Sequence, residues 1–573
     1  MSKIDSIDDH FKIPVFYNKH KLKLNDNIIS DLELVDTIDP SGINIYSFAF
    51  KSNNCFSKKI INQISQYYTT DIAFLRDTQD ILKKYNSLNH TYDYDNIISL
   101  WDEIKNDTGF KQKYNYVEWE MLDFLNKSEE FLRITSIYSI TSPVLSLLTP
   151  LIIVIIPFCI IKMKGIRLNF KEYVDILQVI ISNQPIGKLF TQFNSVKIEQ
   201  KIYILISACF YLLSIYQNIA YCIKFNTNMK IIHETLFSIR KYIQHTEQTM
   251  NNFLLYSKQL STYNQFNNII VGNLNILCEF NTKLNKLTNY EVSFSKICEM
   301  GVILKSFYEL YNDKTYNDAF LYSFGFNGYI TNLEGLIENI NIGKINFAKF
   351  IHKNIKNKTK IKNNYYAPLI NKTPIKNNIK FSKNIIITGP NASGKTTILK
   401  STLINVILSQ QFGCGFYDSA TLYPYKYIHC YLNIPDTSGR DSLFQAESRR
   451  CKEILDIIHQ FKDDKHICIF DELFSGTNHT EAVISATSFM KYLVEFKNVS
   501  CLLTTHFIKV CKKLNKNVNI KNYNMHTLKT TTNKNIYTYL LKEGISEVKG
   551  GLQVLHDLNF PIEILENIEN IIR

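Results

Sequence analysis

The residues with the clearest chemistry lie in the loop 388–397, whose sequence is TGPNASGKTT. Gly389 and Gly394 let backbone N–H groups turn inward around phosphates, and Lys395 can reach the β- and γ-phosphates of a nucleotide. The hydroxyl of Thr396 suits Mg²⁺. An apolar, strand-like run precedes the loop and a helix-like run follows it, so we predict ATP and Mg²⁺ as cofactors. The residues predicted to bind the nucleotide are Gly389, Pro390, Asn391, Ala392, Ser393, Gly394, Lys395, Thr396 and Thr397.

A pair of acidic residues follows a second apolar run, 467–470. Asp471 suits a magnesium site at the end of this predicted strand, and Glu472 can polarise the attacking water as a general base. A further predicted strand, 499–505, leads to His506, which stands where a γ-phosphate sensor would. The predicted catalytic residues are therefore Glu472 and His506, and the predicted metal ligands are Thr396 and Asp471.

The order of these motifs resembles the ATPase domain of the MutS mismatch-repair family, a relative of the ABC ATPases. The matching stretches are TGPNASGKTT at 388–397, SGRDSLFQAE at 438–447, FDELFSGTNHTEA at 470–482, TTHF at 504–507 and SEVKGGLQVL at 546–555. The resemblance implies an α/β P-loop ATPase with a parallel sheet over residues 365–573. It also implies that Ser442 is offered to the nucleotide of a second subunit, and therefore a homodimer. Ser442 also suits a helix N-cap, and both roles can hold at once.

Two departures from the family pattern concern the nucleotide. Ala392 and Ser393 replace the family's Met-Gly, and we expect phosphate binding to survive because the framing glycines remain. No aromatic residue stands in 374–377, where the family places one against adenine. Tyr365 and Tyr366 are nearby substitutes, although packing is the more common role of a tyrosine.

The residues that detect mismatches in the family are a Phe-x-Glu wedge in an N-terminal α/β domain. The Phe-x-Glu matches seen here are 170–172 and 307–309, which lie in hydrophobic or helical surroundings. We therefore expect no mismatch recognition by this chain alone. Binding of mismatched or branched DNA is implied by the family but not by the sequence.

Two charge-free runs, 134–161 and 202–223, are each long enough for a membrane helix. Prolines 143, 150 and 157 would weaken a soluble helix, whereas neighbouring groups in a membrane can satisfy the freed carbonyls. The basic residues between the runs argue the other way, because the positive-inside rule would place them in the cytoplasm. They are Lys162, Lys164, Arg167, Lys171, Lys188, Lys197 and Lys201. Three interpretations stay open: two transmembrane helices, a re-entrant or interfacial hairpin, and a buried core hairpin.

The composition adds little about partners. The net charge of +13 suits nucleic acid or an anionic membrane, yet Lys, Asn, Ile and Tyr crowd the whole chain. The 12 cysteines are scattered without a Cys-x-x-Cys pair, which disfavours a zinc site. The first residues lack an apolar secretory core, so we expect the ATPase domain to face the cytosol.

Four regions are predicted along the chain: a mostly helical region 1–130, the hydrophobic pair 131–225, a helical lever-like domain 226–364 and the ATPase domain 365–573. The fold class is thus an α/β P-loop ATPase preceded by mostly α-helical domains with two long hydrophobic helices. We predict a dimeric, ATP-hydrolysing switch attached to a membrane or to an altered DNA-binding module. The alternatives are DNA repair or recombination with the apolar runs as core, and a membrane-anchored scaffold with a residual nucleotide site. An ABC-type ATPase outside the MutS branch is disfavoured because no LSGGQ-like signature lies between the glycine-rich loop and the acidic motif at the end of the second apolar run.

Overall fold

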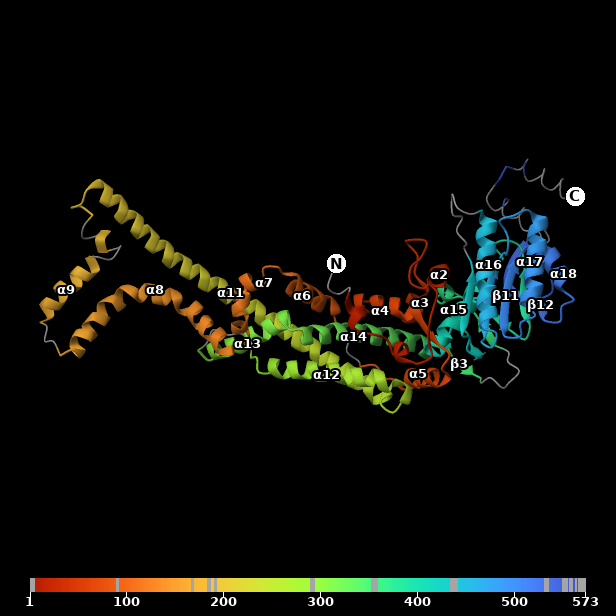
Figure 1. The fold of residues 1–573 in the computed structure, drawn as a ribbon, viewed down its shortest axis with the longest axis horizontal. Coiled ribbons are helices and arrows are strands. Elements are labelled where there is room, and N and C mark those ends of the chain that lie inside the picture. The colour runs from red at the N-terminus through yellow and green to blue at the C-terminus, as the bar shows by residue number, and fades with distance from the viewer. Residues whose placement is uncertain are drawn as a thin grey trace. The chain divides into compact units, whose positions relative to one another are not determined.

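The computed structural model describes residues 6–88, 92–165, 169–182, 187–189, 193–288, 294–351, 359–432, 442–529, 535–548, 555, 560–561 and 564. The chain divides into two compact units (Figure 1). In the described part of the chain, unit 1 comprises residues 92–247 and 274–320. Unit 2 comprises residues 6–91, 248–273 and 321–573.

Unit 1 is helical in the part of the chain that the structure describes. Its elements are α6 (Tyr94–Asn106), α7 (Phe110–Lys113), η3 (Glu120–Lys127), α8 (Glu129–Met163), α9 (Phe170–Ser182) and α13 (Phe294–Asn312), with parts of α11 (Ile198–Ser257), α12 (Asn264–Leu284) and α14 (Lys314–Asn341). Its core is aromatic: Trp101 stacks on Phe320 with ring centroids 5.0 Å apart, and Phe110 stacks on Tyr311 at 4.0 Å. The first turn of α8 lies against α13, where a Cβ on Gly301 would sit 2.3 Å from the carbonyl oxygen of Glu129. A glycine is therefore required at this helix crossing.

Both predicted apolar runs are helical and lie in α8 and α11. Two helices in the described residues are long and apolar enough to cross a membrane, Glu129–Leu148 within α8 and Ile198–Ser257. In their most apolar windows only 22% and 11% of the residues are buried. That exposure does not fit the interpretation of a buried core hairpin in the single chain.

Unit 2 begins with a layer of small elements. They are α1 (Ile7–His10), η2 (Pro14–Tyr17), β1 (Lys21–Lys23), α2 (Asp26–Asp31), α3 (Ile45–Phe50), α4 (Cys55–Gln66), β2 (Tyr67–Thr69) and α5 (Ile72–Lys84), followed later in the chain by η4 (Ser261–Tyr263). Amphipathic spacing explains α4 and α5, whose apolar residues lie on one face. Asn54 and Asp71 cap these helices by accepting hydrogen bonds from backbone N–H groups.

The C-terminal part of unit 2 holds a six-stranded sheet in the order β13-β12-β6-β11-β10-β9. The strands are β6 (Asn384–Thr388), β9 (Tyr427–Tyr431), β10 (His466–Asp471), β11 (Val499–Thr505), β12 (Ile520–Lys529) and β13 (Asn535–Glu543). Five of them are parallel, as predicted, but β13 pairs antiparallel with β12. Only residues 530–534 join these two strands, and a parallel return needs a crossover of a dozen residues or more. The prediction of an all-parallel sheet is wrong at this edge.

A second sheet, which the sequence analysis did not predict, has the order β5-β4-β8-β3-β7. Its strands are β3 (Asn346–Phe350), β4 (Lys360–Asn364), β5 (Asn377–Lys380), β7 (Cys414–Gly415) and β8 (Ser419–Leu422), and η5 (Ala367–Leu369) lies between β4 and β5. Most of its pairs are antiparallel, and the strands are too short and polar for alternation to reveal them.

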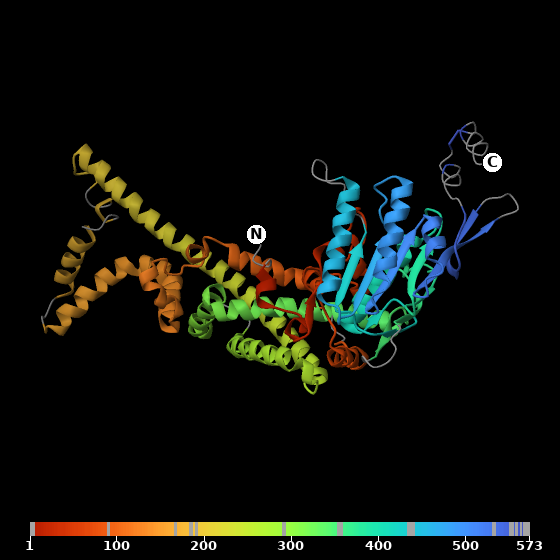
Figure 2. The same cartoon turned by 45° about the vertical axis from the view of Figure 1, so that its right-hand side comes forward.

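Helices cover both faces of the six-stranded sheet. On one face α16 (Leu443–Gln460) and α17 (His479–Leu493) run side by side (Figures 1 and 2), and α18 (Ile508–Leu514) completes this layer. They pack on Cys468, Phe470, Cys501 and Leu503. Because strand side chains alternate, Ile467, Ile469 and Leu502 point to the other face, where α15 (Lys395–Phe412) lies.

The helix α15 is buried along almost its whole length. Its far end bonds to the N-terminal layer: Gln411 donates to the carbonyls of Ile64 and Tyr67 at 2.7 and 3.0 Å, and the hydroxyl of Tyr46 donates to Gln411 at 2.8 Å. Gln410 donates to the carbonyl of Thr69 at 3.2 Å. The N-terminal layer therefore forms part of the wall around the helix that follows the glycine-rich loop.

Candidate nucleotide-binding site

The glycine-rich loop joins β6 to α15. Gly394 has a φ of +93°, which side chains rarely adopt, and an added Cβ would lie 3.1 Å from the ring of Tyr539. Ala392 also has a positive φ of +61°, a conformation that costs about 1–2 kcal/mol for a residue with a Cβ. Ser393 is buried, and its hydroxyl donates to the carbonyl of Pro390 at 2.7 Å. Ser393 therefore closes the loop with an internal hydrogen bond.

Lys395 is folded back onto the loop that precedes it. Its ammonium donates to the carbonyls of Gly389 and Pro390 at 2.9 and 3.2 Å, and its side chain is only 5% exposed. It also lies 3.7 Å from a carboxylate oxygen of Glu472. Burial lowers the pKa of Lys395, while the charges of Glu472 and Asp471 oppose that shift. The loop, the lysine and the acid pair are thus within reach of one another.

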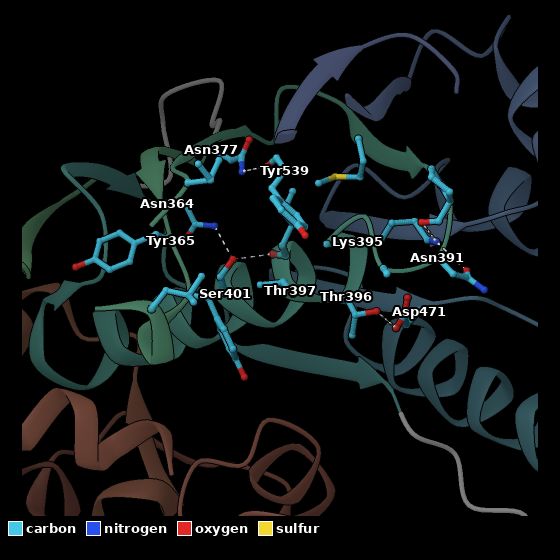
Figure 3. A pocket seen from close by; sticks show the side chains of 18 of the residues that line it. Asn364, Tyr365, Asn377, Asn391, Lys395, Thr396, Thr397, Ser401, Asp471 and Tyr539 are labelled. Carbon is cyan, nitrogen blue, oxygen red and sulfur yellow. Dashed lines mark hydrogen bonds between the residues drawn. The ribbon is translucent and has the colours of Figure 1, made fainter. Parts of the chain in front are cut away.

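Asp471 and Thr396 meet between β10 and α15. The hydroxyl of Thr396 donates to Asp471 Oδ2 at 2.7 Å (Figure 3). On the other side, the hydroxyl of Thr504 donates to Asp471 Oδ1. The parallel register of β10 and β11 places Asp471 beside Thr504, which explains that contact. Two hydroxyls and a carboxylate are the oxygen donors that Mg²⁺ prefers, so these residues fit such an ion.

Glu472 follows the end of β10 in a left-handed conformation, with a φ of +48°. Its backbone N–H donates to the carbonyl of Thr504 at 3.0 Å, which holds this turn against β11. The carboxylate lies 3.5 Å from His506 Nδ1, and the hydrogen bond to His506 is the main cause that lowers the pKa of Glu472; Lys395 lowers it further. The structure therefore brings Glu472, His506 and Lys395 together from three separate segments.

Lys395, Thr396, Asp471 and Glu472 border a cavity of about 820 Å³. Most of the predicted loop lines it, with Asp471 and Glu472 on one side. Figure 3 shows Thr397 and Ser401 of α15 below Tyr539 and Asn377. Its volume is in the range of a small-molecule or cofactor site.

The two tyrosines suggested by the sequence both line this cavity, but they differ. Tyr365 is buried, and its hydroxyl donates to the carbonyl of Lys344, so it is held by packing. Tyr366 is half-buried. Burial raises the pKa of each to about 12, so both are neutral at physiological pH. The ring of Tyr366 is the freer of the two for contact with a base.

Ser442 caps α16, as one reading of the sequence predicts. Its hydroxyl accepts a hydrogen bond from the N–H of Gln445 at 3.3 Å, and the amide oxygen of Gln445 accepts from the N–H of Ser442 at 2.9 Å. This reciprocal pair is a capping box. The preceding residues 433–441 lie outside the described part of the chain, as do residues 549–554 of the SEVKGGLQVL stretch.

Sequence reasoning gave Glu447 no role, although it is buried and holds the loop after β10. Its carboxylate accepts hydrogen bonds from the N–H and hydroxyl of Ser475, both at 3.0 Å, and from the N–H of Gly476 at 3.2 Å. A glutamate inside the predicted helix gave no sign of these contacts, because the partners are distant in sequence.

Tyr539 was also missed. It lies in β13, where the pairing with β12 is irregular between Met525 and Thr527, and it has a φ of +56°. The carbonyl of Tyr539 accepts a hydrogen bond from Asn377 at 2.9 Å, which joins β13 to β5. The irregularity turns the ring over Gly394, and no pattern in the residues 535–543 indicates such a bulge.

The geometry so far defines a class: an α/β domain with a phosphate-binding type of loop beside an acidic strand end. Comparison with known proteins agrees, because residues 385–573 match the family model MutS domain V. Residues 385–573 are thus similar to MutS domain V.

Individual relatives match about a third of the chain or less. "MutS protein homolog 4" of Mus musculus is 29% identical over 208 residues, 35% of this chain and 21% of that protein. "DNA mismatch repair protein Msh3" of Dictyostelium discoideum is 30% identical over 32% of this chain and 13% of that protein. "Endonuclease MutS2" of Staphylococcus haemolyticus is 32% identical over 25% and 18%. The matches thus span about a fifth of these relatives or less.

Proposed function

We propose that this protein binds and hydrolyses ATP in the cavity beside the glycine-rich loop, and that it acts as a MutS-like, dimeric nucleotide-driven switch. The observation that carries the proposal is the meeting of Lys395, Thr396 and Asp471 around the cavity, 2.7 Å separating the hydroxyl of Thr396 from Asp471. The match of residues 385–573 to MutS domain V supports it.

The residues have distinct roles in this proposal. Backbone N–H groups of the loop and the ammonium of Lys395 bind the phosphates, and a phosphate oxygen replaces the carbonyls that Lys395 now contacts. Thr396 and Asp471 hold Mg²⁺, which neutralises charge on the phosphates. Glu472, freed from Lys395, orients and deprotonates water, while His506 keeps the carboxylate in place at 3.5 Å.

The first test is Glu472→Gln. The variant should bind ATP with the affinity of the wild-type protein and lower kcat by about 10²–10⁴-fold, the contribution typical of a general base. Glu495→Gln, at an exposed position of the same domain, is the matched control and should keep the normal rate. Normal turnover in Glu472→Gln would remove Glu472 from the mechanism. Absence of turnover in the wild-type protein would favour the scaffold with a residual nucleotide site.

We further propose that Ser442 contacts the nucleotide of a second copy, since its place at the start of α16 puts its hydroxyl at a helix N-terminus. Ser442→Asp separates this role from capping, because aspartate is an equally good N-cap but repels phosphate. The variant should keep its thermal stability and lose ATP-dependent dimerisation, measured by light scattering. Dimerisation equal to wild type would leave Ser442 as a cap alone.

DNA binding is the second candidate function. It is favoured by the names of the relatives, which include DNA mismatch repair proteins, and by the net charge of +13. DNA-stimulated ATP hydrolysis that weakens steeply with salt would support it. We also propose that the ATPase domain faces the cytosol, where ATP is available.

A further inference from the structure

The placement of polar and apolar side chains on α8 is the reverse of that in a soluble helix. Ser136, Ser139 and Ser142 are only 0%, 3% and 5% exposed, while Val144 and Leu147 are 55% and 57% exposed. The three serines recur every third residue, so they form one stripe on the inner side of the helix. Water around α8 would favour the opposite placement.

Two of the carbonyls freed by prolines in α8 are bonded by side chains. Pro143 and a proline at position 150 have no N–H to give to the carbonyls of Ser139 and Ser146. The hydroxyl of Ser142 donates to the carbonyl of Ser139, and the hydroxyl of Tyr211 in α11 donates to that of Ser146, both at 3.4 Å. A helix in contact with water would not need these bonds, whereas a helix in hydrocarbon does.

The helices α8 and α11 are antiparallel where they meet. Cys222 lies 3.7 Å from the carbonyl of Ile140, and Tyr211 meets Ser146 further along. Beyond that point the two helices diverge (Figures 1 and 2). Apolar side chains on α11 stay exposed, with Phe210 at 68% and Leu212 at 58%.

Charges bound both apolar runs. Arg133 precedes and Lys162 follows the run in α8, and Lys201 precedes and Lys224 follows the run in α11. At ~1.5 Å per residue the charge-free runs are roughly 42 Å and 33 Å long, and a bilayer's hydrocarbon core is about 30 Å thick. Cations at both ends suit the phosphates of two layers of headgroups.

The helix α9 lies between the two runs and carries both kinds of side chain. Lys171, Glu172 and Asp175 are exposed in its first half, and Val174 and Val179 are 41% and 61% exposed. Side chains of both kinds find compatible surroundings at the boundary between headgroups and hydrocarbon.

We propose that α8 and α11 insert as a pair into a phospholipid bilayer, which covers their apolar surface, with the serine stripe and Tyr211 turned inward. This goes beyond the proposed ATPase function and does not depend on it. A spanning hairpin and a re-entrant hairpin both insert into hydrocarbon. The proposal is therefore that lipid covers the apolar surface of α8 and α11 in either arrangement.

The test replaces exposed apolar side chains by lysine in the full-length protein. Leu147→Lys, Phe210→Lys and Leu213→Lys are combined in one variant; these side chains are 57%, 68% and 49% exposed. The matched control combines Leu255→Lys, Ile484→Lys and Val518→Lys, which are 78%, 53% and 76% exposed outside the apolar runs. Circular dichroism shows whether each variant keeps its helices.

Membranes of expressing cells are extracted with alkaline carbonate and then floated on a density gradient. The wild-type protein and the control should float with lipid, and the Leu147 variant should move to the soluble fraction with a loss of at least tenfold in the floating pool. Equal floating of both variants would overturn the proposal. So would a wild-type protein that stays soluble, alone or in a stable complex with another protein, or one that pellets without lipid, because in each case lipid does not cover the surface.

Discussion

The six-stranded sheet of unit 2 and the helix pair α8–α11 of unit 1 place their side chains by opposite patterns. In β10 the apolar residues 467–470 are fully buried, and the charged residues follow at the end of the strand. In α8 the serines are buried while leucine and valine face outward. If lipid covers the helix pair, as we propose, each region buries the groups that its surroundings solvate poorly.

The largest expected effect comes from substituting Lys395, which should change nucleotide binding in unit 2 and leave the helix pair of unit 1 unaffected. Lys395→Ala should weaken ATP binding by about 100-fold, roughly 3 kcal/mol, because it removes a charged donor from a buried site. Its floating with membranes should not change. Lys452→Ala, at an exposed lysine of α16, should alter neither property. Fluorescent nucleotide titration measures the first effect, and loss of floating in Lys395→Ala would show that the regions are not independent.

Acid should destabilise the sheet more than the helix pair. Burial, and the charge of neighbouring His466, lower the pKa of His429 to about 3 from its usual 6.5. The unfolded histidine therefore gains a proton below pH 6.5 while the folded one does not, so stability is lost as pH falls from 6.5 towards 3. At pH 5.5 the titration of His429 alone should lower the free energy of unfolding by about 1.4 kcal/mol.

Hydrogen–deuterium exchange of the β9 and β10 peptides at pH 7.5, 6.5 and 5.5 measures this effect. His429→Gln should flatten the pH dependence, because glutamine can keep a hydrogen bond to His466 without titrating. His459→Gln, at an exposed histidine of α16, is the control. An unchanged pH dependence in His429→Gln would exclude His429 as its source.

The smallest effect probes the bond between α8 and α11. Tyr211→Phe removes the hydroxyl that reaches the carbonyl of Ser146, which should cost about 0.6 kcal/mol, the average for a hydrogen bond between membrane helices. Thermal unfolding in detergent, followed by circular dichroism, measures the change. Tyr216→Phe removes a hydroxyl from a ring that is 69% exposed and should have no effect. Equal melting of the two variants would argue against this bond.

Much of the nucleotide site could be predicted because its residues stand in short, ordered motifs. The loop 388–397 and the acids after β10 are local patterns, and parallel strands bring their ends to one edge of a sheet. The contact of Thr504 with Asp471 was within reach of the same reasoning, since both residues lie near the carboxyl ends of their strands.

The missed features depend on contacts between distant segments. Glu447 meets Ser475 and Gly476 only after α16 and β10 have packed together. Tyr539 reaches the loop because of a bulge in the β12–β13 pair. One unpaired residue is enough to form such a bulge and change the register of the strands. In the apolar runs the sequence predicted helices but left the surroundings open, because length and composition do not distinguish lipid from protein.

The burial of α15 by the N-terminal layer limits which fragment of the chain can fold when it is separated from the rest. The stretch that matches MutS domain V begins at residue 385, yet the end of α15 is held by Tyr46, Ile64 and Tyr67, more than 300 residues earlier in the chain. A fragment cut near residue 365 would leave the amide of Gln411 without these partners, Gln410 without the carbonyl of Thr69, and Phe412 without the ring of Phe50. The segment that can be recognised by comparison is therefore smaller than the segment that can be moved to another protein and still fold.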